Sequence, residues 1–279
     1  NAAGETLVDF GRNMAGILEI GPIDGKAGQR IVIRHGELVQ NDELYTGNLR
    51  TAKQTLDYTC RDGIQTYRPE FTYMGFQYVA VTGMEVTEEN LAAWDIYSDM
   101  EQIGDFSCSD ERLNQFQKNI QTSLKANFVD IPTDCPQRDE RCGWTGDIAL
   151  FAPTAAFNMD IAGFMNKWLG DLALVQKAVG VVPSIVPSNG FIRDRKSNFW
   201  ATVYDQDDAV WGDAAVLVTW AVYQSNGDAS LLERQYDSMK AWVEYERTMA
   251  EKGALGNRYK KYIWDKGFHL GDWLAPGEN

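Results

Sequence analysis

The stretch DIPTDCPQRDERCGWTGD, residues 130–147, is the segment of the chain that is densest in side chains capable of chemistry. It holds five carboxylates, two arginines and a tryptophan, and its two prolines and two glycines disfavour regular helix over most of its length. An apolar helical run begins near Ile148, so Asp147 is expected in or just before the first turn of a helix. The stretch is therefore predicted to be a polar loop that leads into a helix.

Before residue 105, apolar and polar residues alternate over short runs, as they do in strands that bury one face. Turn residues such as Asp24-Gly25 and Asp62-Gly63 separate the runs. The runs occupy residues 16–20, 30–34, 54–60 and 76–81. This pattern predicts an antiparallel β-sandwich over residues 1–104, and the sandwich could begin upstream of residue 1.

From residue 105 onward the apolar period becomes that of helices. Ser109, Asp110 and Glu111 stand where a helix cap and its first-turn acids belong. The apolar stripes predict helices over about residues 113–124, 161–175, 213–224 and 230–251. Long segments rich in Pro, Gly, Asp and Trp separate them, and loops of such length usually carry function.

Aromatic residues make up 12% of the chain and include nine tryptophans, which fits a carbohydrate site because sugar C–H faces stack on indole rings. The alternative is that most of these side chains fill the core. Three tryptophans on helical stripes are predicted to be core residues: Trp168, Trp220 and Trp242.

Composition narrows the classes of partner. A net charge of −14 argues against nucleic acid and against an anionic membrane surface. Two histidines and four cysteines without a CxxC pair argue against a zinc site, and the cysteines are expected to be free thiols, with a Cys135–Cys142 disulfide as the alternative. The acidic run 205–208 lacks the spacing of a calcium loop and is predicted to be a solvated turn.

The polar loop offers the groups that glycoside hydrolysis needs. A carboxylic acid must deliver a proton to a poor leaving group, and its neighbours must accept sugar hydroxyls and offer a face for stacking. The loop supplies all three kinds of group through Asp134, Arg138, Asp139, Glu140, Trp144 and Asp147. The alternative is a solvated loop whose aspartates and arginines pair with one another.

The fourteen residues from Asp134 to Asp147 resemble the signature of glycoside hydrolase family 78, the α-L-rhamnosidases. Further segments resemble the same family: Val8–Gly16, Val181–Pro187, Val210–Ala214 and Leu270–Leu274. The resemblance covers nearly the whole chain. It implies a β-sandwich followed, over residues 105–279, by the first half of an (α/α)6 barrel.

The resemblance also implies roles for individual residues. The general acid falls on Glu140, and the sugar-binding residues fall on Asp134, Arg138, Trp144, Asp147, Trp211 and Trp273. Without the resemblance, Trp211 and Asp213 could simply begin a helix. The implied reaction releases terminal α-L-rhamnose with inversion and requires no metal or cofactor.

An inverting glycosidase needs a second carboxylate to activate water. The resemblance places this base on a late barrel loop beyond residue 279, a position that Glu278 does not match. We therefore expect residues 1–279 alone to be inactive and, because half a barrel exposes apolar faces, prone to aggregate. Two other functions remain open, namely a hydrolase of a different sugar and a carbohydrate-binding remnant without catalysis. The cellular compartment and oligomeric state are also left open.

Overall fold

The computed structural model describes residues 1–187, 207–252 and 262–271. These residues form two compact units. One unit contains residues 1–99 and 106–141, and the other contains residues 100–105 and the chain from 142 onward. The predicted boundary near residue 105 marks the change from strands to helices, whereas the compact units place residues 106–141 with the strands.

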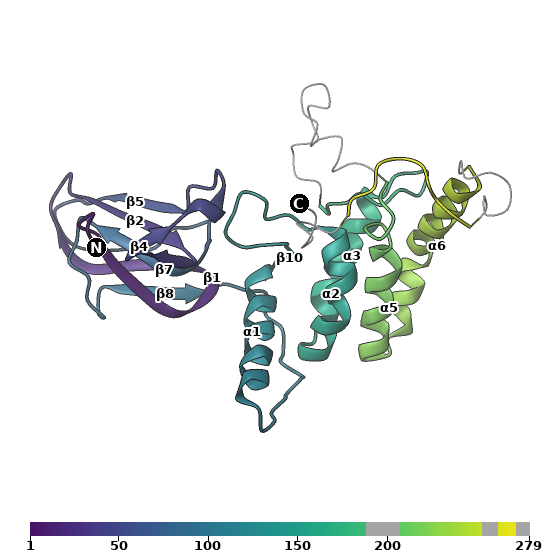
Figure 1. The fold of residues 1–279 in the computed structure, drawn as a ribbon, viewed down its shortest axis with the longest axis horizontal. Helices are drawn as coiled ribbons and strands as arrows, with labels where there is room; N and C mark the ends of the chain where they lie inside the picture. Colours follow the sequence, from purple (N-terminus) through teal and green to yellow (C-terminus); the bar gives the residue numbers. More distant parts are fainter. Residues whose placement is uncertain (188–206, 253–261, 272–279) are drawn as a thin grey trace. The chain divides into compact units, whose positions relative to one another are not determined.

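The first unit is built on an antiparallel sheet, whose strands lie side by side in Figure 1. Its order is β5-β2-β7-β1-β6, and β8 also pairs with β1. The strands are β1 (Thr6–Gly25), β2 (Arg30–Gly36), β5 (Thr55–Thr59), β6 (Gly63–Tyr67), β7 (Met74–Thr82) and β8 (Leu91–Asp95). All of the predicted strand runs are confirmed. A separate two-stranded sheet pairs β3 (Leu38–Gln40) with β4 (Glu43–Tyr45).

The long strand β1 organises the sheet because it changes partners along its length. Its first part pairs with β7, and its later parts pair with β8 and β6. Register shifts after Asp9 and after Ile20 interrupt the ladders. Such irregularities bend a strand, which lets one strand serve three neighbours.

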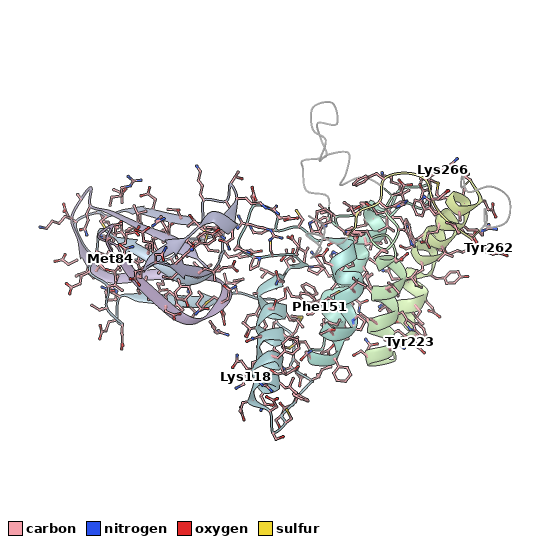
Figure 2. The ribbon with its side chains drawn as sticks, viewed as in Figure 1. Met84, Lys118, Phe151, Tyr223, Tyr262 and Lys266 are labelled. Carbon is pink, nitrogen blue, oxygen red and sulfur yellow. The ribbon has the colours of Figure 1, made fainter. Side chains whose placement is uncertain are left out.

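The core of the sheet follows the alternation in the sequence. The side chains of Leu18 and Ile20 on β1 and of Ile31 and Ile33 on β2 are at most 1% exposed. They cluster with Phe76 of β7, and Met84, labelled in Figure 2, packs against this cluster. Residues two apart on a strand share a face, so this spacing alone buries one side of each strand.

Helix α1 (Glu111–Asn127) begins where the cap residues predicted it. The Asp110 side chain accepts a hydrogen bond from the backbone N–H of Arg112. The predicted apolar stripe is only partly right, because Leu124 is buried but Leu113 and Phe116 are 50% and 61% exposed. A short hairpin follows, formed by β9 (Phe128–Val129) and β10 (Ile131–Pro132).

The second unit contains helices α2 (Thr145–Asn158), α3 (Ala162–Val175), α5 (Ala214–Asn226) and α6 (Ala229–Glu251). They run side by side in Figure 1, and α5 contacts each of the other three. Helices α2 and α5 contact each other, and both bury small residues, among them Ala152, Ala155 and Ala214, which are all fully buried. Small side chains allow two helices to approach closely. These helices confirm the predicted change to a helical region.

Burial corrects one of the predictions made from helical stripes. Trp168 and Trp242 are fully buried, as predicted, but Trp220 is 48% exposed. The ring centroid of Trp220 lies 5.3 Å from that of Tyr223, which is labelled in Figure 2. Likewise Tyr236 of α6 is 58% exposed. Both helices carry apolar residues on more than one face, so spacing alone could not identify the buried face.

The described part of the chain holds no helix that is long and apolar enough to cross a membrane. The four cysteines are free thiols, as expected.

Candidate active site

The carboxyl group of Glu140 lies between two arginines of the first unit. Nε of Arg138 and Nη1 of Arg50 each donate a hydrogen bond to the same oxygen, Oε2, at 2.9 Å. The Glu140 side chain is 16% exposed, which keeps it open to a ligand. Charge-assisted bonds of this kind are among the stronger polar contacts in proteins, and two of them hold the carboxyl group in one orientation.

Arg138 also connects Glu140 to Asp134. Its Nη2 atom lies 3.4 Å from Oδ2 of Asp134, whose side chain is only 6% exposed. Three of the predicted site residues are thus brought together around one guanidinium group. Asp134 and Arg138 line a cleft of about 280 Å³, together with Asn13 and Glu37 from the sheet.

Cys135 lies beside these groups but is not suited to nucleophilic chemistry. Burial raises the pKa of its thiol to about 12, and the neighbouring Asp134 carboxylate contributes to the rise. A thiol in this setting stays protonated at neutral pH. Asp134, Cys135 and Glu140 bring three ligand atoms within 4.8 Å of one another, but a protonated thiol and the Arg138 guanidinium make the group a poor cation site.

The loop that carries Glu140 is tied to the sheet at several further points. The backbone N–H and hydroxyl of Thr51 donate to Oδ2 of Asp139, and Nε2 of Gln54 donates to the carbonyl of Gln137. The Thr51 hydroxyl bond lowers the pKa of Asp139. Gly75 of β7 makes the close approach of Gln137 feasible, since a Cβ at this position would lie 2.7 Å from the Gln137 Cβ.

The second unit holds the other predicted site residues that the structure describes. Trp144 is 9% exposed and packs with Cys142 and Ile185, and the partly buried Trp211 and Leu270 pack against this cluster. Asp147 is exposed in the first turn of α2, as predicted. Trp273 lies outside the described residues.

The glycines of the two tryptophan motifs are explained by this packing. A Cβ on Gly146 would lie 2.6 Å from the indole of Trp211. A Cβ on Gly212 would overlap the indole of Trp242, and a Cβ on Gly143 would overlap the Val186 carbonyl. Because each of these glycines lacks a Cβ, an aromatic ring or a neighbouring backbone segment can approach it closely, and a larger residue would fill that space.

Asp208 corrects part of the prediction that the acidic run 205–208 is a solvated turn; residues 205 and 206 lie outside the described residues. Its side chain is fully buried, and burial raises its pKa. It accepts hydrogen bonds from the Ser184 hydroxyl and from the backbone N–H of Leu270, each at 2.9 Å. Asp208 therefore links three loops of the second unit, each of which carries a family motif or adjoins one.

The carboxyl groups of Asp213, just before α5, and Glu246, on α6, form a pair. Oδ1 of Asp213 accepts a hydrogen bond from Nε1 of the buried Trp242 at 2.9 Å. Burial raises the pKa of Glu246 to about 7, and its contact with the Asp213 carboxyl adds to the rise. Asp213 is the residue that directly precedes α5, which agrees with the simpler interpretation of its position.

Four residues that hold these loops in place escape sequence reasoning. Arg50 and Thr51 lie far along the chain from the loop that they hold, and no local pattern marks them. Asp208 has the composition of a surface turn. Gly75 gives a faint signal as a glycine within a strand, which often marks a close approach of backbone.

The chain combines an antiparallel sheet and a helical region with a carboxyl group, that of Glu140, which two arginines hold. Comparisons with known proteins identify its family. Residues 1–97 match the bacterial alpha-L-rhamnosidase concanavalin-like domain, and residues 101–279 match the bacterial alpha-L-rhamnosidase 6 hairpin glycosidase domain. The chain belongs to the bacterial α-L-rhamnosidase family, which confirms the resemblance and the fold inferred from the sequence.

Individual relatives agree. An α-L-rhamnosidase of Alteromonas sp. (strain LOR) is 35% identical over 276 residues, which cover 97% of this chain and 27% of that protein. The crystal structure of native α-L-rhamnosidase from Aspergillus terreus has a TM-score of 0.86 and 38% identity, over 100% of this chain and 31% of that one. The Streptomyces avermitilis α-L-rhamnosidase complexed with L-rhamnose has a TM-score of 0.80 and 37% identity, over 88% and 23% of the two chains. The chain thus spans about a quarter of the length of these relatives.

Proposed function

We propose that this chain is part of an enzyme that hydrolyses terminal α-L-rhamnosyl linkages with inversion, with Glu140 as the general acid. The observation that carries the proposal is the constellation of Glu140, Arg138 and Asp134 in a member of the α-L-rhamnosidase family. The S. avermitilis relative, whose structure is a complex with L-rhamnose, supports rhamnose as the sugar.

The geometry of Glu140 suggests how the proton is delivered. Since two N–H donors point at Oε2, the proton to be transferred would sit on Oε1. It would pass to the glycosidic oxygen as the bond to the anomeric carbon breaks, and water would attack from the opposite face of the sugar. Asp134 and Arg138 would then orient the sugar hydroxyls, and the family resemblance also assigns Trp144, Asp147, Trp211 and Trp273 to sugar binding.

The base of this reaction is proposed to lie beyond residue 279. Asp134 is too close to Glu140 for that role, because their carboxyl oxygens lie within 4.8 Å. The carboxyl groups of inverting glycosidases stand about 6.5–9.5 Å apart, to leave room for water. The shorter spacing is instead near that of retaining enzymes, in which Asp134 would be the nucleophile.

The first experiment tests the acid. Glu140→Gln is introduced into a polypeptide of the relatives' full length that contains this sequence, and turnover is measured on aryl α-L-rhamnosides of differing leaving-group acidity. We expect a loss of roughly 10²- to 10⁴-fold for poor leaving groups and a much smaller loss for activated ones, because only the former need protonation. Glu88→Gln, at an exposed position of the sheet unit, is the matched control.

The outcomes separate the competing functions. Turnover of another aryl glycoside but not of rhamnosides would keep the mechanism and change the substrate. A folded protein that cleaves no glycoside would favour the binding remnant. The anomer first released, followed by NMR, tests the stereochemistry: β-L-rhamnose indicates inversion, whereas α-L-rhamnose would favour Asp134 as a nucleophile.

A further inference from the structure

We propose that Arg50, contributed by the segment between β4 and β5, is a positioning residue for catalysis that fixes the orientation of the Glu140 carboxyl group. The inference rests on the proposed function, because it requires Glu140 to be the general acid. It assigns the β-sheet unit a direct part in the reaction, beyond any binding of carbohydrate.

The first argument is the contact itself. Arg50 Nη1 and Arg138 Nε donate to one oxygen of Glu140, each at 2.9 Å, from two separate segments of the chain. One donor would still allow the carboxyl group to swing about that bond. Two donors from different directions restrict this motion and present Oε1, the proposed proton carrier, in a fixed direction.

The second argument is the backbone at Arg50. This residue follows the short 3-10 helix Gly47–Leu49. Its backbone has φ 56° and ψ −113°, a conformation that residues other than glycine rarely adopt. Gln54, four residues further on, also has a positive φ of 44°. Strained residues of this kind persist only where the surroundings hold them, and they cluster at functional sites.

The third argument is the support beneath the Arg50 loop. Gln54 is 3% exposed, and its carbonyl accepts hydrogen bonds at 2.9 Å from both the backbone N–H and the Nδ1 of the buried His35 on β2. Its side chain donates to the carbonyl of Gln137, a residue whose Cβ lies over Gly75. Contacts from the sheet core thus extend through the segment of residues 50–54 to Glu140 and to the residues just before it.

The structure distinguishes this arrangement from an ordinary surface ion pair. Arg30 pairs with Asp57 on the same sheet, but Arg30 is 66% exposed and its pair has no contact of this kind with the catalytic loop. Arg50 is 41% exposed, and its partner Glu140 is 16% exposed. A positioning role also makes a prediction that a stabilising role does not, because a misoriented acid impairs only those substrates that need the proton.

The test uses Arg50→Ala, Arg50→Gln and Arg50→Lys in the same full-length polypeptide, with Arg30→Ala as the matched control. For poor leaving groups we expect kcat to fall roughly 10- to 100-fold in Arg50→Ala, as for loss of one charge-assisted bond. For activated aryl rhamnosides the fall should be at least five times smaller. Arg50→Lys should recover part of the loss, and Arg30→Ala should match the unmodified protein.

Two results would overturn the inference. One is an equal loss on good and poor leaving groups, which indicates a structural role, and the other is unchanged turnover in Arg50→Ala. Arg50→Gln removes the charge but keeps a polar side chain with an N–H donor, and it gives a reading if Arg50→Ala fails to fold. Glu140→Gln, measured alongside, separates the two proposals: if it shows no dependence on the leaving group, the proposed acid itself is wrong.

Discussion

The loop of Glu140 and the loops of the tryptophans are held in place by different physical means. The Glu140 loop is fixed to the sheet by polar bonds from Arg50, Thr51 and Gln54. The tryptophan loops are fixed by shape, with Trp211 seated on Gly146 and Trp242 seated on Gly212. Polar bonds fix the direction of a side chain such as that of Glu140, whereas close packing fixes the position of an aromatic ring.

This difference predicts different sensitivities. The stability of the tightly packed tryptophan region should respond to changes in side-chain volume and hardly at all to changes in charge, because steric contacts do not depend on ionisation. A loop held by hydrogen bonds should respond to pH and to the loss of single polar groups.

The largest effect is expected where the packed region loses volume. Trp242→Ala removes a fully buried indole and its bond to Asp213, and it should lower the free energy of unfolding by about 3–5 kcal/mol. Trp220→Ala is the matched control, since Trp220 is 48% exposed, and should cost well under half as much. Urea denaturation measures both, and equal losses would contradict the assignment of the buried face.

The sheet beneath the Glu140 loop should depend on pH through His35. Burial lowers the pKa of His35 to about 4 from an ordinary value of 6.5. The native state therefore binds fewer protons than the unfolded state between these values, and stability is lost as pH falls from about 6.5 to 4. The shift corresponds to about 3 kcal/mol.

The variant His35→Gln isolates this contribution, because an amide does not titrate in this range. The change in unfolding free energy between pH 6.5 and 4 should be smaller in the variant than in the unmodified protein by that amount. An identical change in both proteins would mean that other groups cause the pH dependence.

Asp208 makes hydrogen bonds within the tightly packed region, so its loss should affect stability and also change the dependence of stability on pH. Asp208→Ala leaves the Ser184 hydroxyl and the Leu270 N–H without their acceptor and should cost about 1–3 kcal/mol. Asp208→Asn keeps an acceptor oxygen and should cost less. Because burial raises the pKa of Asp208, the folded state holds a proton that the unfolded state has already released, and the free energy of unfolding falls as pH rises through that pKa. The Asn variant does not titrate and should lack this fall. Thermal denaturation at several pH values provides the comparison.

The smallest effect applies a steric test to the polar region. Gly75→Ala should displace Gln137 and cost about 1–2 kcal/mol, since the added Cβ would lie 2.7 Å from the Gln137 Cβ. Gly163→Ala is the control, because nothing lies within 4 Å of its added Cβ and alanine favours helix. A larger loss of stability in Gly163→Ala than in Gly75→Ala would show that the close approach in the sheet is not limiting.

Local patterns predicted the secondary structure well because period and capping act over a few residues. The alternation before residue 105 gave the strands, and Asp110 gave the start of α1. The cluster of Asp134, Arg138 and Glu140 was also recognisable, since the three residues lie within one loop and within one family motif.

Contacts between distant segments could not be predicted from the same patterns. Arg50 and Glu140 are 90 residues apart, and nothing in either segment specifies the other. Asp208 looks solvated until its partners are known, and these lie 24 and 62 residues away. Trp220 and Trp242 have similar helical spacing, and only the packing of α5 and α6 determines which of them is buried.

The bond between Arg50 and Glu140 bears on how members of this family can be recombined. The two family domains meet between residues 97 and 101, which makes this the obvious place to join halves of different homologues. A junction there would combine Glu140 from one homologue with the segment of Arg50 from another, so the two residues would no longer come from the same protein. A chimera joined after residue 141 would instead take Glu140 and Arg50 from a single parent and inherit their bond intact.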